Sequence, residues 1–440
     1  MKKRTQFSLF CIVLLISGLL GSTLAFAAGT TAGGALPSPT VEDTTNAINT
    51  VSIKKELIFV NDNGSVVREP NIEYTYTMAP VDMSSASATV TTDDAGPVPV
   101  KSGVADAITN TDKKAVITFA DTATCTSSAD GTGTYRYADF TFDPSKFTDG
   151  PGIYRYVITE TVSPTKASVG ISEASNYKDV RYLDVYVRKT SETNADPVVY
   201  GYTLFEAEAS NLSFSSVTGN NVNLTAKSQG FVNKSTTAGS PEDVDVYCTQ
   251  DLTIAKVTTG LMADKTNNFP VAINLTQPST VTATVKYDVA LANGAALTTT
   301  GSDTIGAYVE TSATAYSGSV CDTSTITFKG LPEGTTVVLQ EQNNTSDTYK
   351  VKAEAVVGSA TATSILTEAS VAAGDNSNAT TSTAITGTTT ITITNTLETI
   401  SPTGYVTRFA PYVLILAGGI LLIVFGRAAV GRTSKKRKNA

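Results

Sequence analysis

The chain has 440 residues, of which 32 are Lys or Arg, 40 are Asp or Glu and none is His. Without histidine, no Ser-His-Asp triad, Cys-His dyad or His-ligated metal site can form. The sequence also lacks a P-loop and a G-x-G-x-x-G motif leading into a helix, so we expect neither an enzyme nor a metal or cofactor site.

The N-terminus has the pattern of a secretory signal peptide. Three basic residues at positions 2–4 precede an apolar stretch over 7–20, and Ala25-Phe26-Ala27 supplies small residues for a cleavage site. We expect residues 1–27 to be removed. Residues 28–48 are rich in Ala, Gly, Thr and Pro, which is typical of a flexible leader.

The sequence that follows is typical of β-structure. Thr, Ser, Val and Tyr are abundant, and apolar and polar residues alternate in runs such as Tyr182–Val187. A polar break around 237–248 separates two such regions. We therefore predict an all-β chain with two tandem β-sandwich domains, at 49–236 and 249–397, joined by a linker at 237–248.

Both domains repeat three features in the same order. An opening strand carries a lysine on its apolar face, a later turn leads into a strand that ends in glutamate, and the closing strand carries an asparagine. These residues are Lys55, Glu160 and Asn233 in the first domain, and Lys256, Glu341 and Asn395 in the second.

Strand alternation decides which lysine of the first domain faces inward. Val51 and Ile53 share one face with Lys55, whereas the neighbouring Lys54 lies on the other. In an apolar core, desolvation lowers the pKa of a lysine and raises that of a glutamate, so a neutral amine can meet a neutral acid. Such an amine can attack an asparagine carboxamide while the acid polarises the carbonyl, which leaves a Lys–Asn isopeptide bond and releases ammonia.

The C-terminus has the pattern of a membrane anchor. An apolar segment over 405–426 is long enough to span a bilayer, and the basic tail at 427–440 is expected on the cytoplasmic side. The two terminal segments hold 10 of the 32 basic residues and none of the 40 acidic ones, so the part between them carries a formal charge of −18. That charge argues against nucleic acid as a partner.

These features together resemble the streptococcal-type backbone pilins, whose tandem Ig-like (CnaB-like) domains are each locked by a Lys–Asn isopeptide bond. The likeness is strongest in Glu69–Tyr76, Gly152–Glu160, Asp251–Lys256, Leu331–Glu341 and Thr394-Asn395. The resemblance implies cross-links between Lys55 and Asn233 and between Lys256 and Asn395. Glu160 and Glu341 would promote their formation.

The resemblance also implies a function for Ser401-Pro402-Thr403-Gly404, which lies within the segment 398–404. It looks like a pilin-type sortase signal, which a sortase would cleave between Thr403 and Gly404 to pass the threonyl group to an amine. Proline directly precedes threonine here, unlike the commoner L-P-x-T-G spacing, which favours a pilus-dedicated sortase.

The function implied is that of a structural subunit of a covalent surface pilus, attached to the cell wall. Its implied partners are identical subunits, a pilin-type sortase and peptidoglycan, together with ancillary pilins and a host surface. The acceptor lysine of the next subunit would be Lys227, with Lys234 and Lys101 left open. The alternative is a monomeric wall-anchored adhesin or an ancillary pilin built from the same modules.

Two further readings stay open at this point. Cys248 and Cys321 are candidates for a disulfide that would leave Cys125 free in an oxidising location. Sequons of the N-x-S/T type allow a eukaryotic surface glycoprotein, although Thr- and Asn-rich sequence produces such matches by chance. Among these sequons are those at Asn211, Asn223, Asn274 and Asn378, and Asn233 begins another.

Overall fold

The structure is a computed structural model. It describes residues 47–65, 67–84, 89–92, 96–125, 134–173, 177, 179–191, 193–206, 227–228, 230–231, 245–298, 308–310, 314–397, 414–417 and 419–420. The predicted signal peptide, the sortase motif, the basic tail, Asn233 and Lys234 lie outside these residues. In this described part of the chain, no helix has the length and apolar character needed to cross a membrane.

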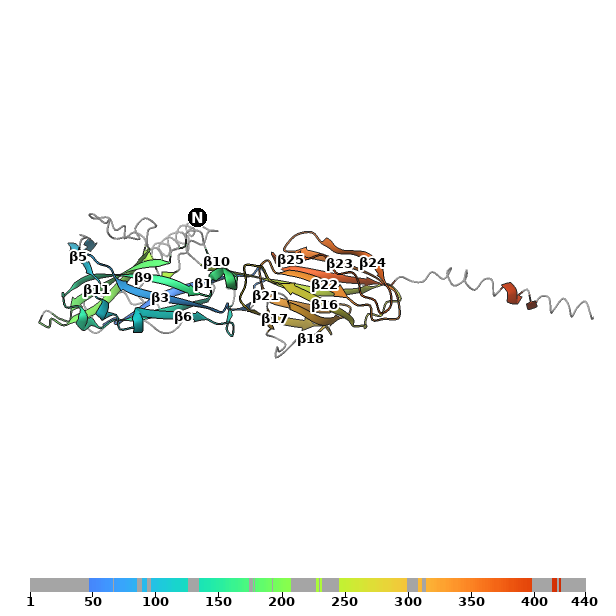
Figure 1. The fold of residues 1–440 in the computed structure, drawn as a ribbon, viewed down its shortest axis with the longest axis horizontal. Helices are drawn as coiled ribbons and strands as arrows, with labels where there is room; N and C mark the ends of the chain where they lie inside the picture. The colour runs from blue at the N-terminus through green and yellow to red at the C-terminus, as the bar shows by residue number, and fades with distance from the viewer. Residues whose placement is uncertain are drawn as a thin grey trace, which may run out of the picture.

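The described chain is almost entirely β-structure, which confirms the all-β prediction, and it forms two bodies placed end to end (Figure 1). In the first body, one sheet has the strand order β13-β12-β11-β9-β3-β6, with β5 beside β9 and β4 beside β5. These strands are β3 (Ile72–Pro80), β4 (Thr89–Thr92), β5 (Gly96–Ser102), β6 (Lys114–Phe119), β9 (Gly152–Ser163), β11 (Val180–Lys189), β12 (Pro197–Glu206) and β13 (Lys227–Ser228).

The facing sheet of the first body is built around β1 (Thr50–Val60). β1 pairs antiparallel with β8 (Thr134–Thr141) and parallel with both β14 (Gly230–Phe231) and the start of β15 (Asp245–Thr259). β10 (Ile171–Glu173) adds to β15. The smaller elements are β2 (Val67–Arg68), β7 (Thr124–Cys125), η1 (Ala105–Ala107), η2 (Thr111–Lys113), η3 (Pro144–Lys146) and η4 (Lys166–Val169).

The second body also packs two sheets over one core. Their strand orders are β19-β17-β21-β15-β26-β23-β24 and β18-β20-β16-β22-β25. The strands are β16 (Phe269–Thr276), β17 (Val285–Ala292), β18 (Ala296–Thr298), β19 (Tyr308–Glu310), β20 (Thr314–Val320), β21 (Thr325–Pro332), β22 (Thr336–Glu341), β23 (Tyr349–Val357), β24 (Thr363–Val371), β25 (Thr383–Ala384) and β26 (Thr389–Thr396).

Alternation along the strands produces both cores. On β1, Val51, Ile53 and Leu57 face inward, and on β26, Ile391 and Ile393 do the same. Each body has its own large apolar core cluster, and the first body has a second, smaller one that includes Val100 and Tyr182.

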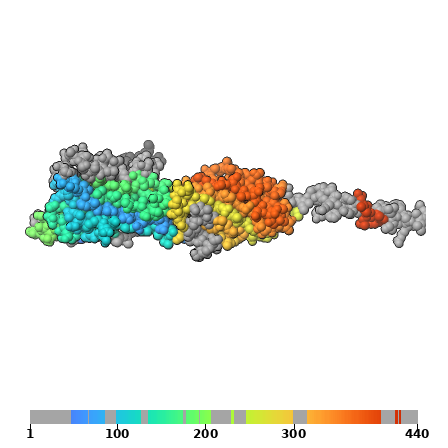
Figure 2. Space-filling view, viewed as in Figure 1, coloured from blue at the N-terminus to red at the C-terminus, as the bar shows by residue number. Residues whose placement is uncertain are grey.

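One strand, β15, belongs to both bodies. Residues 245–248 pair with β1, whereas the stretch from Leu252 onward pairs with β26. Tyr247 packs in the first core and Leu252 in the second, and residues 249–252 are buried on both faces. The sequence prediction placed 245–248 in a linker, and this part was wrong because the strand continues through the junction without a turn. Figure 2 shows the two bodies in a row along the long axis.

Polar contacts hold the junction between the bodies. Asp251 accepts hydrogen bonds from Asn61 (3.0 Å), Asn63 (3.2 Å) and Ser65 (2.5 Å), all in the loop after β1, and from the Gly330 backbone amide (3.0 Å). Because Asp251 is buried, removing it would leave several donors without an acceptor.

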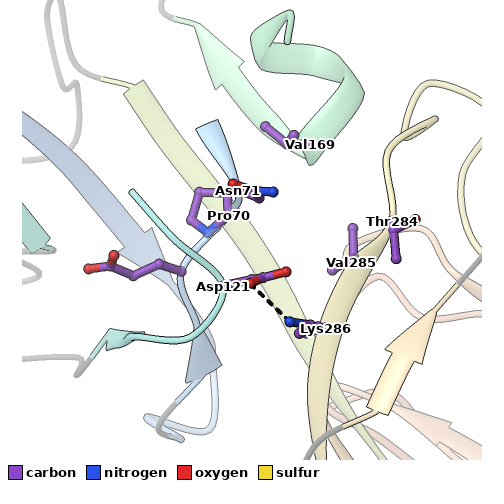
Figure 3. Close-up of a pocket in the computed structure, with 8 residues that line it drawn as sticks. Pro70, Asn71, Asp121, Val169, Thr284, Val285 and Lys286 are labelled. Atoms are coloured by element: carbon purple, nitrogen blue, oxygen red, sulfur yellow. Dashed lines mark hydrogen bonds and ion pairs between the residues drawn. The ribbon is translucent and has the colours of Figure 1, made fainter. Parts of the chain in front are cut away.

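Two ion pairs flank this contact. Arg68 of β2 pairs with Asp288 of β17 at 3.0 Å, and Lys286 pairs with Asp121 at 3.1 Å. The second pair lines a small pocket between the bodies, with Pro70 on its wall (Figure 3). Both pairs are partly exposed, so they contribute less to stability than the buried Asp251.

We predict that Asp251→Ala destabilises the protein by about 3 kcal/mol, because buried donors from both bodies lose a charged acceptor. Scanning calorimetry should show a lower melting temperature, and small-angle scattering should show a broader range of maximum dimensions. Asp347→Ala, which changes an exposed carboxylate in the second body, is the matched control. Equal melting curves for the two variants would contradict this role.

Candidate cross-linking sites

The second body brings its three predicted residues together in the core. Lys256 comes from β15, Glu341 from the end of β22 and Asn395 from β26. The lysine Nζ lies 2.5 Å from Glu341 Oε2, and the asparagine Nδ2 donates to Glu341 Oε1 at 2.6 Å. All three side chains are at most 2% exposed. A single carboxyl group thus contacts both the amine and the carboxamide.

Strand register explains why these residues meet. β15 and β26 are parallel neighbours, with Lys256 opposite Ile393 and Thr258 opposite Asn395. The asparagine therefore lies two residues beyond the partner of the lysine, which places both side chains on the same face of the sheet. Glu341 reaches them from the opposing sheet.

The surroundings of Lys256 favour its neutral form. Burial lowers the pKa of this lysine to about 8, although the adjoining Glu341 opposes the shift. The Nζ also lies 4.3 Å from the centre of the Phe269 ring, which keeps water away. Near neutral pH, an amine with this pKa is neutral for part of the time and is then a nucleophile.

The orientation of the Asn395 amide has a chemical consequence. Its Oδ1 is buried and has no hydrogen-bond partner among the described residues. Oxygen and nitrogen of an amide occupy nearly the same shape, so a half-turn of the group would set Oδ1 against Glu341 Oε1. A protonated Glu341 could then donate to that oxygen and polarise the carbonyl.

In the first body, Lys55 and Glu160 also meet in the core. The lysine Nζ lies 3.1 Å from Glu160 Oε2, and neither side chain is more than 2% exposed. Lys55 faces inward as strand alternation predicts, whereas Lys54 is partly exposed and pairs with Glu56 at 3.0 Å. Asn233, the third residue of the predicted set, lies outside the described residues, so that cross-link stays a prediction.

Tyrosines enclose the first site. Tyr76 donates to Glu160 at 2.8 Å, Tyr177 also donates to Glu160, and Tyr74 lies under the Lys55 ammonium at 4.2 Å from its ring centre. Burial, followed by the neighbouring carboxylates, raises the pKa of all three phenols well above the ordinary value. They therefore stay protonated and act as hydrogen-bond donors.

The first site also contains two charged residues that the sequence reasoning missed. Asp245 at the start of β15 lies 2.6 Å from Lys55, and Lys166 of η4 lies 3.3 Å from Glu160 and 3.0 Å from Asp245. A signal for Asp245 is present in the sequence, because the alternation Asp245-Val246-Tyr247 puts the aspartate on the same face as the apolar Tyr247. Its assignment to a linker concealed that signal. Lys166 stands in a short helical turn, which has no sequence pattern that points inward.

The structure gives limited information on the candidate acceptor lysines. Lys227 forms part of β13, where it pairs with Phe205 of β12, and its side chain is outside the described set. Lys101 donates to the carbonyl oxygens of Asp149 at 2.6 Å and Pro151 at 2.9 Å. An amine held in this way is less available to a transferase than a free one, so Lys227 stays the preferred prediction over Lys101.

The disulfide expected between Cys248 and Cys321 is wrong, because both cysteines are free, as is the buried Cys125. Cys321 lies near Lys256, since the amide of neighbouring Thr323 donates to the Lys256 carbonyl at 3.0 Å. Cys248 is eight residues before Lys256 on the same extended strand, which corresponds to about 26 Å at the usual rise per residue. A disulfide needs Cα atoms within about 7 Å.

A family model described as "Domain of unknown function (DUF7601)" matches residues 250–397. No match was found among curated proteins. Among solved structures, the chain is similar to the major pilin from Streptococcus pyogenes, with 19% identity, a TM-score of 0.39, and coverage of 81% of this chain and 100% of that one.

Two other solved structures give the same kind of likeness. The major pilin T3.2 from Streptococcus pyogenes serotype GAS13637 has 17% identity and a TM-score of 0.39, over 80% of this chain and 98% of that one. The pilus-presented adhesin Spy0125 (Cpa) has 12% identity and a TM-score of 0.23, over 80% of this chain and 100% of that one.

The lowered pKa of Lys256 predicts how stability depends on pH when no bond can form. In an Asn395→Ala variant, the free amine has a pKa of about 8 in the folded state and 10.5 when unfolded. Between these values the unfolded chain binds more protons, so the free energy of unfolding rises with pH. The total rise should be about 3 kcal/mol.

Chemical denaturation followed by circular dichroism from pH 7 to pH 10.5 measures this rise. The control is the double variant Lys256→Met with Asn395→Ala, in which the rise should be missing. The interpretation fails if both variants show the same dependence on pH.

Proposed function

We propose that this chain is the structural backbone subunit of a covalently polymerised Gram-positive surface pilus. In this proposal, each of its Ig-like domains carries an intramolecular isopeptide bond. A pilin-type sortase joins Thr403 to a lysine of the next subunit and finally links the fibre to the cell wall. The chain is a substrate of the sortase, and the only chemistry that it performs is on its own side chains.

The observation that carries this proposal is the position of Glu341 between Lys256 and Asn395. A buried ion pair and a buried amide contribute little to stability by themselves, because the cost of removing them from water offsets their attraction. An apolar substitution would serve a purely structural role equally well. A lysine and an asparagine that both contact one glutamate are, however, the groups that amide exchange requires.

The reaction balances without any added reactant. The neutral Lys256 amine attacks the Asn395 carboxamide carbon, a new C–N bond forms, and one amine proton passes to the departing –NH₂ group, which leaves as ammonia. Glu341 donates a hydrogen bond to the carboxamide oxygen and relays the proton, so that it ends in its starting state.

The location of this bond suits a fibre under tension. β15 is the first strand of the second body and β26 is the last, and they lie side by side. A cross-link between them passes load directly from one end of the domain to the other, without unfolding the strands between. By the chain-entropy relation, closing a loop on the order of 100 residues also stabilises the fold by about 5 kcal/mol.

The two ends of the second body also suit head-to-tail assembly. Its first strand enters from the first body, and β26 ends beside Thr259, whose carbonyl accepts a hydrogen bond from the Leu397 amide. Because β15 runs from its pairing with β1 to Thr259, this end of the second body is the one farther from the first body (Figure 1). The predicted sortase motif follows within a few residues, so the acyl group would be presented at the tip of the subunit.

The cross-link is tested by peptide mapping of the mature protein. We expect the peptides that contain Lys256 and Asn395 to be joined, with the loss of one ammonia. Glu341→Ala should leave them separate, because no group then relays the proton. Glu354→Ala, which changes a half-exposed glutamate on β23, should leave the joined peptide unchanged. Separate peptides in the unmodified protein would overturn the cross-link.

Polymerisation is tested on a denaturing gel of cell-wall extracts. A backbone subunit gives a ladder of very large covalent species, and the ladder should disappear in Thr403→Ala and in Lys227→Ala. Lys352→Ala, on the exposed face of β23, is the control that should keep the ladder. A single band from the unmodified strain would instead indicate the monomeric adhesin, and a ladder that survives Lys227→Ala would move the acceptor to another lysine.

A further inference from the structure

From the geometry of the first body, we infer that Lys55 forms its isopeptide bond with Asp245, releasing water, and does not form it with Asn233. This inference rests on the proposed function and makes it more specific. In the first domain, the acceptor residue becomes Asp245 in place of Asn233, and the leaving group becomes water in place of ammonia. The sequence-based choice of Asn233 assumed that both domains use the same three residue types.

Strand register gives the first line of support. In the second body, Lys256 lies opposite Ile393. Two residues further along the strands, Thr258 lies opposite Asn395. In the first body, Lys55 lies opposite Phe231, and two positions further along, Leu57 lies opposite Asp245.

Both pairings are parallel, so Asp245 takes the place in the first domain that Asn395 takes in the second. Asn233 is two residues beyond Phe231 in the sequence, but the residue that pairs with Leu57 belongs to β15.

The contacts of Asp245 give the second line. Its Oδ2 lies 2.6 Å from Lys55 Nζ, and both side chains are fully buried. The Tyr74 hydroxyl donates to the same oxygen at 2.7 Å. Glu160 lies 3.1 Å from the Lys55 Nζ and so occupies the position of Glu341 in the other site. The amine, the acyl carbon and the proton relay are therefore in mutual reach.

Charge balance gives the third line and explains Lys166. A carboxylate in place of a carboxamide adds one negative charge to the buried site, and Lys166, about nine-tenths buried, adds one positive charge. In the described ion pairs, Glu341 of the second site has one lysine partner, Lys256. After bond formation between Lys55 and Asp245, the Lys166 ammonium still faces Glu160 and Glu173. The buried Lys166 and the buried Glu160 therefore each keep a partner of opposite charge.

The reaction again balances. The ammonium of Lys55 and the carboxylate of Asp245 form one amide, and the two protons that the nitrogen loses leave with one carboxylate oxygen as water. Glu160 takes the first proton from the ammonium before the attack, because only the neutral amine is a nucleophile, and takes the second after the C–N bond has formed. It passes each proton to the departing oxygen. Tyr74 donates to Oδ2 and stabilises the negative charge that develops on this retained oxygen during the attack, so Oδ1 is the oxygen that departs. No oxidant, metal or activated cofactor is required.

The experiment is peptide mapping of the mature full-length protein and of three variants. In the unmodified protein, the peptide that contains Lys55 should be joined to the one that contains Asp245, with the loss of one water. Asn233→Ala should leave this joined peptide unchanged. Asp245→Ala should release the two peptides, and Asp245→Asn should rejoin them with the loss of ammonia in place of water.

Other results overturn the inference. A bond from Lys55 to Asn233, or an unmodified Lys55 in a protein whose Lys256 and Asn395 peptides are joined, would refute Asp245 as the acceptor and leave the proposed function standing. If the Lys256 and Asn395 peptides are also separate, the failure belongs to the proposed function itself. In each variant, the joined peptide that contains Lys256 and Asn395 also serves as an internal control that the second body has folded.

Discussion

A lysine held against a glutamate inside an apolar core is the constraint on which both halves of this molecule depend. Ionised groups are costly to bury, and each body places such a pair at the centre of its sandwich, where the opening strand meets its parallel neighbour. The surrounding β-structure is the means of holding it there. Long strands with strict alternation put Lys55 and Lys256 on the inward face, and the opposing sheets bring Glu160 and Glu341 to meet them.

The two sites offset the cost of burying charged groups with different residues. In the second body, one carboxyl group serves an amine and a neutral amide, and the phenyl ring of Phe269 keeps water away. The first body holds two carboxylates and two ammonium groups, with tyrosines filling the remaining contacts. Burial would raise the pKa of Asp245, but Lys55 and Lys166 outweigh that effect and hold it below the ordinary value. The first site is therefore a cluster of four charged groups, whereas the second holds one lysine, one glutamate and a neutral amide.

Sequence alone was sufficient for the all-β class and for the inward position of Lys55, Lys256, Glu341 and Asn395, because period-2 alternation reports directly which face is buried. It was insufficient at the junction. Residues 245–248 follow a polar stretch and contain an aspartate, so composition suggested a linker, but pairing with β1 is decided by a strand almost two hundred residues earlier. The contact of Lys166 with Glu160 is equally non-local, and no spacing rule anticipates it. The mistaken disulfide had a similar origin, since the position of Cys321 near Lys256 depends on a non-local contact that residue types do not reveal.

The continuity of β15 bears on how the molecule would respond to damage. The strand carries Asp245 near one end, where it contacts Lys55 of β1. Near the other end it carries Lys256, and Glu341 of β22 contacts both this lysine and Asn395 of β26. With both bonds formed, a covalent route would run from β1 through β15 to β26 and pass by every loop in between. A protease that cut one exposed loop in either body would then leave the pieces joined, and the subunit would still be a single molecule from its first strand to its last.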